Sequence, residues 1–189
     1  MRVHRPLPID HKIKVGYNEF LVSKTDEHGN ILYVNDTFLK ISGYEEINLL
    51  GTPHSIVRHP DMPACIFYLM WQRLKKGENI QALVKNLARS GEYYWVSTDF
   101  EIRYEGNQKT YLAFRRGVSK DAIETIEPLY QQLLKIEKKH GIQASLVYLE
   151  SFLQENQMTF NEYMNSILKP KKLIAIIFNT LKNSFRHSA

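Results

Sequence analysis

Cysteine is almost absent from this sequence, because Cys65 is the single thiol among its 189 residues. One thiol excludes an intramolecular disulfide framework and a multi-cysteine zinc site, and it is typical of a reducing compartment. Long apolar runs are also missing: no stretch approaches the roughly 20 apolar residues of a membrane-spanning helix. The basic amino terminus has no continuous apolar core and does not resemble a signal peptide. We therefore expect a cytoplasmic protein, with peripheral contact to the inner face of the cell membrane as the alternative.

Acidic residues are absent from the end of the chain, residues 169–189. Lys and Arg outnumber Asp and Glu by 25 to 20, and the basic residues of this segment account for the whole net charge of +5. Its apolar residues recur on one face of a predicted helix. This basic amphipathic helix can pack on its own domain, contact anionic lipid or dock on a receptor. A charge this small and this localised does not indicate a nucleic acid partner.

Short β-rich runs and helical patterns alternate along the rest of the chain. Hydrophobic residues make up 43% of the sequence, which is enough for a packed core. The runs Phe20–Thr25 and Ile31–Val34 flank the turn formers DEHGN and predict a hairpin. Three longer strand-like runs follow at residues 80–88, 93–104 and 108–118. This order predicts an α+β fold in which helices cover one face of an antiparallel sheet.

Helix signals fill the interval between the hairpin and the later strands. Asn35 is a candidate N-cap for a helix through Ile41, and Ser42 with Glu45 has capping-box spacing for a second helix that ends at Gly51. Residues 62–76 show one apolar face and predict a longer helix. The polar loop HSIVRHPDMP lies just before this helix.

The predicted carboxy-terminal region is helical. An apolar seam begins at Ile126, and Pro128 is expected to kink or restart that helix. A second helix is predicted over residues 144–154, and Thr159 with Glu162 forms a capping box for a third. The expected domains are an amino-terminal lead-in, a sensor domain, a helical linker and the basic helix, at residues 1–18, 19–118, 119–168 and 169–189.

Several motifs run in order along residues 20–135: YVNDTFLKISGY, GTPHSIVRHPDMP, MWQRLKKGE, VKN, GEYYWV and IEPLY. Together they resemble the FAD-binding PAS domain of aerotaxis receptors and the start of the segment that follows it. The resemblance implies a PAS fold: a five-stranded antiparallel sheet with short helices that enclose a cofactor cavity, followed by a helical extension. With no evident membrane anchor or long coiled coil, the chain is most similar to the soluble PAS half of bipartite energy-taxis systems.

The family resemblance also implies a function. PAS domains of aerotaxis receptors hold FAD non-covalently and report cellular redox state to the chemotaxis machinery. We therefore expect a non-enzymatic redox sensor that contacts a membrane chemoreceptor or its HAMP and signalling region, with a homodimer as a further contact. The sequence has no nucleophile paired with a base, no phosphate-binding loop and no metal-ligand spacing that would indicate an enzyme or a metal site.

The resemblance assigns candidate cofactor-binding residues. Arg58, His59 and Asp61 match family positions implicated in flavin binding, and a guanidinium suits a pyrophosphate or a flavin carbonyl. Trp71 matches a family tryptophan, although an aromatic on an apolar helix face can equally be core. Asn86 lies where flavin-binding PAS domains place an amide toward the isoalloxazine edge. Asp61 has a second interpretation as the N-cap of the helix that follows.

Two departures from flavoprotein patterns leave alternatives open. The family pattern Gly-Glu-x-Trp-x-Gly is replaced here by GENIQA, with Ile80 and Ala82 at the changed positions. His54 stands three residues after Gly51, where blue-light photoreceptors of the PAS class carry a cysteine, so we expect no adduct photochemistry. A cofactor-free interaction module, or a haem protein with His54 or His59 as axial ligand, remains the alternative to FAD.

Overall fold

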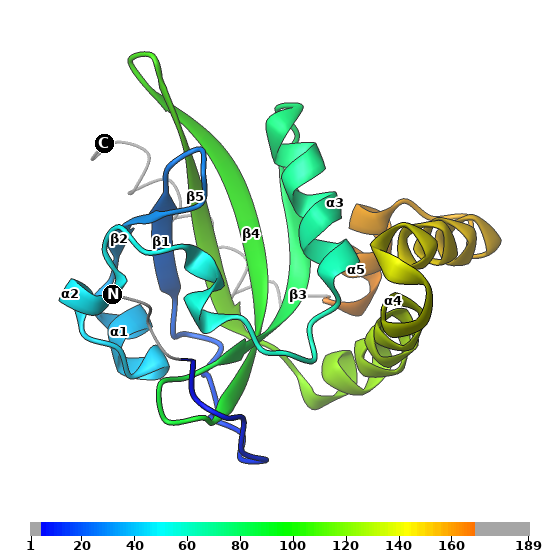
Figure 1. Ribbon diagram of the computed structural model, residues 1–189, viewed down its shortest axis with the longest axis horizontal. Helices are drawn as coiled ribbons and strands as arrows, with labels where there is room; N and C mark the ends of the chain where they lie inside the picture. The colour runs from blue at the N-terminus through cyan, green and yellow to red at the C-terminus, as the bar shows by residue number, and fades with distance from the viewer. Residues whose placement is uncertain (1–4, 169–189) are drawn as a thin grey trace.

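The computed structural model describes residues 5–168 and contains a twisted antiparallel sheet with helices on one face and along one edge (Figure 1). The sheet has five strands in the order β2-β1-β5-β4-β3, so β2 and β3 are its edges. The predicted α+β class and five-stranded PAS fold are confirmed. The strands are β1 (Leu21–Thr25), β2 (Ile31–Val34), β3 (Ile80–Leu87), β4 (Tyr93–Glu105) and β5 (Gln108–Gly117).

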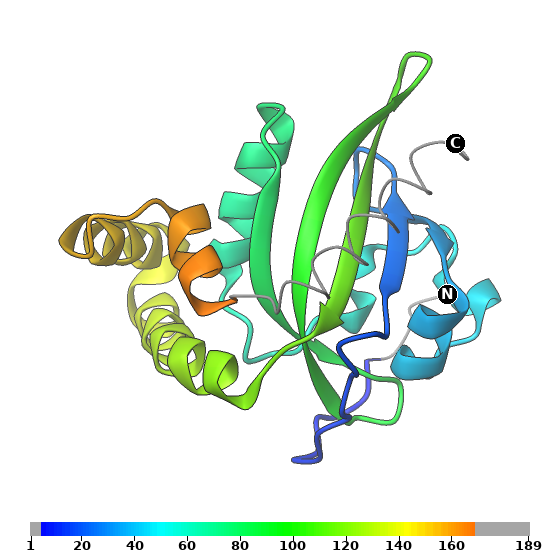
Figure 2. The same cartoon turned by 180° about the vertical axis from the view of Figure 1, so that it is seen from behind.

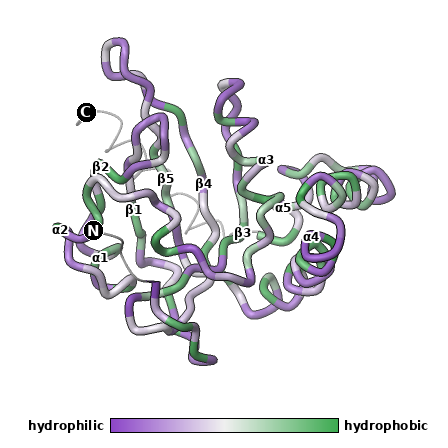
Figure 3. Tube along the Cα trace, in the orientation of Figure 1, coloured by the Kyte–Doolittle hydropathy of each residue, from purple (hydrophilic) through white to green (hydrophobic). Residues whose placement is uncertain are grey.

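The turn between β1 and β2 is held by Asp26. One oxygen of its carboxylate accepts from the backbone N–H groups of His28 and Asn30, and Gly29 adopts a positive φ of 84°. The predicted hairpin is therefore present, with β2 at its expected bounds. The loop between β4 and β5 is hydrophilic, as Figure 3 shows, and extends beyond the rest of the sheet.

Short helices follow the hairpin: α1 (Asp36–Ser42), α2 (Glu46–Leu49) and the 3₁₀ helix η1 (His54–Val57). The predicted cap at Asn35 is confirmed, because its side-chain oxygen accepts from the backbone N–H of Phe38. The predicted capping box at Ser42 is wrong. Ser42 is the last residue of α1, and α2 begins after Glu45 without a side-chain cap.

The longer helix α3 spans Ala64–Lys75, two residues inside the predicted start. Asp61 is not its N-cap: Pro63 occupies that position, and its side chain makes no capping hydrogen bond. Proline is tolerated there because the first turn of a helix leaves its N–H groups unpaired in any case. The last turn of the helix contains the basic residues Arg73 and Lys75, which interact favourably with the negative C-terminal end of the helix dipole.

The carboxy-terminal helices are α4 (Lys120–Glu155) and α5 (Phe160–Ile167). The helix does not restart at Pro128, because Pro128 lies within α4 and the helical backbone is interrupted at Gly141, with φ 82° and ψ 174°. A proline's fixed φ fits a helix, whereas a positive φ favours glycine. The predicted capping box of Thr159 and Glu162 is confirmed at the start of α5.

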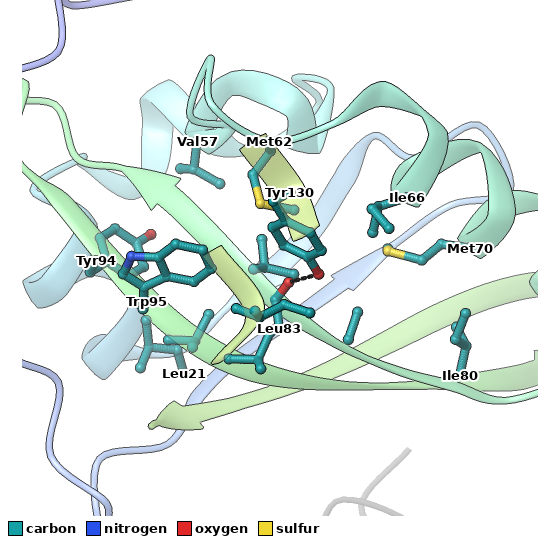
Figure 4. Close-up of a cluster of buried hydrophobic side chains, with 14 of the residues drawn as sticks. Leu21, Val57, Met62, Ile66, Met70, Ile80, Leu83, Tyr94, Trp95 and Tyr130 are labelled. Atoms are coloured by element: carbon teal, nitrogen blue, oxygen red, sulfur yellow. Dashed lines mark hydrogen bonds between the residues drawn. The ribbon is translucent and has the colours of Figure 1, made fainter. Parts of the chain in front are cut away.

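The predicted apolar seam of α4 packs on its own domain. Tyr130 is buried, donates its hydroxyl to the Leu83 carbonyl on β3 at 2.7 Å, and stacks on Trp95 (Figure 4). Viewed from behind, α4 and α5 lie beside β3 at the edge of the sheet (Figure 2). Within residues 5–168, none of the helices has both the length and the apolar character to cross a membrane. The predicted basic amphipathic helix lies outside the described residues.

Candidate functional site

A cavity of about 270 Å³ lies between the sheet and the helices η1 and α3. Its sheet wall comes from alternate residues of four strands, which place their side chains on one face of the sheet. Its other wall comes from the β1–β2 turn, η1 and α3. The side chains that matter most for the chemistry of the cavity are Ser23, His54, Arg58, Phe67, Trp71, Asn86, Phe100, Tyr111 and Arg115.

The cavity is electropositive. Two arginines, Arg58 and Arg115, line it, and no acidic side chain of residues 5–168 does. Most of the remaining wall is apolar or aromatic. A cationic, largely apolar cavity favours a flat ligand that carries negative charge or an edge rich in hydrogen-bond acceptors.

Arg58 and Asn86 form a polar pair across the cavity wall. Their backbones are joined by an isolated antiparallel bridge, which holds the loop after η1 against β3. The Arg58 guanidinium donates to the Met62 carbonyl at 2.9 Å and lies 4.6 Å from the centre of the Phe67 ring. Asn86 is buried, and its side-chain nitrogen makes no hydrogen bond of normal geometry among the described residues, although it interacts with the hydroxyl of Tyr94, its partner on β4. An unpaired buried donor is costly, so this amide is available to a ligand.

Trp71 packs at the turn end of the cavity. Its ring meets Tyr111 edge to face, with 5.4 Å between ring centres. It also lies against Gly29, where an added Cβ would come within 2.9 Å of the indole. The contact requires glycine at the hairpin turn and couples the turn to α3.

His59 and Asp61 do not line the cavity, although the other four predicted site residues do. Asp61 pairs instead with Lys85 at 2.7 Å, and its backbone N–H donates to Nδ1 of His59 at 3.1 Å. Burial and the nearby Lys85 cation lower the pKa of His59 to about 4. These residues order the loop from the side away from the cavity, and any effect on a ligand is indirect.

Cys65, Ile80 and Ala82 are buried in the core and do not line the cavity either. The expectation that Cys65 is core is confirmed, and burial raises the pKa of its thiol to about 12. The replacement of the family tryptophan and glycine by Ile80 and Ala82 therefore leaves the walls of the cavity free of these two side chains. Neither residue brings a polar group to the site.

Sequence reasoning missed Arg115, which is 2% exposed and directs its guanidinium to Ser23 and His54. A signal was present: on β5, Tyr111, Ala113 and Arg115 alternate on the cavity face. An arginine that follows Tyr111 and Ala113 on the same face of a strand is unusual, because arginine is seldom fully buried. Only the register of the sheet shows which face it occupies.

Comparison with known proteins identifies the fold. Residues 31–113 match the family model described as PAS fold. This part of the chain is a PAS domain. Among solved structures, the one titled "Flavin Analogue Sheds Light on Light-Oxygen-Voltage Domain Mechanism" aligns over 63% of this chain and 85% of that chain, with 22% identity and a TM-score of 0.50.

Two relatives are similar in sequence to this chain. The chain is 39% identical over 134 residues to the aerotaxis receptor of Escherichia coli (strain K12), which is 70% of this chain and 26% of that protein. It is 31% identical over 100 residues to the nitrogen fixation regulatory protein of Klebsiella pneumoniae, which is 52% of this chain and 20% of that protein. The chain thus spans about a quarter or less of the length of these relatives.

Proposed function

We propose that this PAS domain binds FAD non-covalently and acts as a redox sensor in aerotaxis or energy taxis, without enzymatic activity. The observation that carries the proposal is the buried Asn86 amide, which has two N–H donors and no hydrogen bond of normal geometry among the described residues, in a cationic cavity. When bound, FAD would supply a ring whose charge and hydrogen bonding change on reduction. The likeness to an aerotaxis receptor supports the same conclusion.

The residues of the cavity fit a flavin ring. Asn86 can donate to an acceptor edge, and Trp71, Tyr111 and Phe100 supply apolar walls. The volume of about 270 Å³ is just below the usual range of ligand pockets, roughly 300–1,000 Å³. We therefore expect the cavity to hold the ring system and the adenylate half of FAD to lie outside it, where the Arg58 side of the cavity favours phosphate.

Haem fits this geometry less well. Nε2 of His54 already faces Arg115 at 2.9 Å and Ser23 at 3.1 Å, so this nitrogen is engaged within the protein. A metal ion beside a buried arginine would also meet charge repulsion. His59 lies off the cavity.

The helical extension is the proposed output. Residues 19–118 would form the sensor, and residues 119–168 would carry its state to a cytoplasmic partner, a membrane chemoreceptor or its HAMP and signalling region. Two contacts support this route: Tyr130 on α4 bonds to β3, and Glu137 on α4 bonds to the start of α3. Both β3 and α3 contribute residues to the lining of the cavity. The basic segment 169–189 would contribute to partner or membrane contact, and a homodimer is compatible with this arrangement.

The absorbance spectrum of the purified protein, before and after addition of FAD, tests the cofactor. We expect two visible flavin bands, and a matched pair of variants locates the site. Asn86→Ala should weaken FAD binding about tenfold, the size of one lost hydrogen bond. Asn48→Ala, an exposed change on α2, should leave FAD binding unchanged.

A folded protein that is colourless and has no affinity for added FAD would contradict the proposal and leave a cofactor-free interaction module. A Soret band would indicate haem. Equal FAD affinity in the Asn86→Ala and Asn48→Ala variants would remove Asn86 from the site.

A further inference from the structure

Arg115 is a buried cation on the cavity face of β5. Nη1 donates to the Ser23 hydroxyl at 2.8 Å and to the Ala113 carbonyl at 3.4 Å, and Nη2 faces Nε2 of His54 at 2.9 Å. All of these acceptors are neutral groups. The rings of Phe38 and Phe100 lie 5.6 and 6.0 Å from the guanidinium carbon.

No acidic side chain of residues 5–168 forms an ion pair with Arg115. Arg58, the other cation of the cavity, differs because the negative charge of Glu137 acts on it. Burying an ion without a counter-charge is expensive. A ligand that brings a negative charge next to Arg115 would offset this free-energy cost of burial and would therefore bind more tightly than a neutral ligand.

His54 and Ser23 fix the direction of the guanidinium. Burial and the neighbouring Arg115 charge hold the pKa of His54 well below its usual range, so the ring is neutral. A neutral ring can accept at the single lone pair of Nε2 from Arg115 or from the Ser23 hydroxyl, and the Ser23 oxygen accepts from Nη1. These contacts occupy the neutral acceptors around Arg115 and leave its positive charge without a counter-charge.

We propose that Arg115, positioned by Ser23 and His54, selects for negative charge on the cavity ligand. This inference rests on the proposed function, in which the ligand is a flavin. In this inference Arg115 on β5 recognises the charge of the ligand, and Arg115 lines the cavity together with Asn86 on β3.

The expected consequence concerns reduction of the bound flavin. Two electrons and one proton added to the neutral ring leave one negative charge, whereas two electrons and two protons leave none. A fixed cation favours the first outcome, so it raises the midpoint potential and lowers the number of protons taken up. For a two-electron couple, one proton gives a slope of about 30 mV per pH unit and two give about 59 mV.

The test is a titration of the FAD-loaded protein with dithionite at several pH values between 6 and 9. Arg115→Gln removes the charge but keeps an amide that can bond to Ser23 and His54, and Arg115→Lys keeps the charge. Arg116→Gln is the matched control, because the next residue of a strand faces the opposite side of the sheet. We expect a slope near 30 mV per pH unit in the unmodified protein, in Arg115→Lys and in the control.

In Arg115→Gln the slope should rise toward about 59 mV per pH unit. The ratio of its affinities for reduced and oxidised FAD should also fall at least tenfold at pH 8, which lowers the potential by about 30 mV. If Arg115→Gln binds too little FAD for titration, the slopes of the unmodified protein and of Arg115→Lys decide, and a two-proton slope in both overturns the inference. Identical slopes and potentials in all variants overturn it while FAD binding stands. A folded protein that binds no FAD overturns both proposals.

Discussion

The carboxylate of Glu137 on α4 accepts a hydrogen bond from the backbone N–H of Cys65 on α3, with 2.7 Å between the two atoms. Its second oxygen accepts from the N–H of Ala64 at 2.8 Å, and Ser145 adds a third donor at 3.1 Å. Because α3 has no side-chain cap of its own, Glu137 supplies the cap from a distant part of the chain. The helical extension is thereby attached to the helix that lines the cavity.

Replacing Glu137 should weaken this attachment. We expect Glu137→Ala to lower the free energy of unfolding by about 1–3 kcal/mol, because two backbone donors and the favourable charge at the helix start are lost together. Urea unfolding measures the change. Glu124→Ala is a matched control, since Glu124 is an exposed residue of α4 that pairs with the exposed Lys120, and it should change stability by less than about 0.5 kcal/mol. Equal losses in the two variants would argue against a capping role.

Local signals in the sequence predicted the local structure well. Asn35 and the pair Thr159 and Glu162 cap their helices as predicted, because each cap accepts from the N–H of the residue three positions further along the chain. The bonds of Asp61 and Glu137 could not be predicted in the same way. Asp61 is a residue type that commonly caps helices and lies just before α3, yet its carboxylate pairs with Lys85 on β3. Such contacts depend on which segments the fold brings together.

The same distinction applies to the candidate site. The family motif pointed to Arg58 and Asn86, and both line the cavity. It also pointed to His59, which does not line the cavity although its neighbour Arg58 does, and whose ring packs edge to face against Tyr93. Arg115 was missed because a motif centred on one loop carries no information about the opposite wall.

Acid should destabilise the fold through His59. Its side chain is 4% exposed, and its pKa is lowered from an unfolded value of about 6.5 to about 4. Between these values the unfolded chain binds more protons, so stability is full above about pH 6.5 and falls as the pH drops toward 4. The facing charges are Lys85, which opposes protonation, and Asp61, which favours it.

Urea unfolding at pH 7 and pH 4.5 tests this prediction. The unmodified protein should lose about 1–3 kcal/mol more than His59→Gln does between the two values. His140→Gln, a change at an exposed residue of α4, should lose as much as the unmodified protein. Parallel losses in all three proteins would exclude His59 as the titrating group, and the buried His54 would then be the next candidate.

Gly29 and Gly51 offer a paired test of the Trp71 contact. Both have a positive φ, 84° and 74°, so alanine meets a similar backbone penalty of about 1 kcal/mol or more at each. They differ in their surroundings: a Cβ at Gly29 would lie 2.9 Å from the Trp71 indole, whereas at Gly51 no heavy atom lies within 4 Å.

Gly29→Ala should therefore displace Trp71 as well as strain the turn. We expect it to lower FAD affinity about tenfold and to shift tryptophan fluorescence, because one wall of the cavity moves. Gly51→Ala should lower stability alone. If the two variants bind FAD equally well, Trp71 is a core residue and contributes nothing to the ligand.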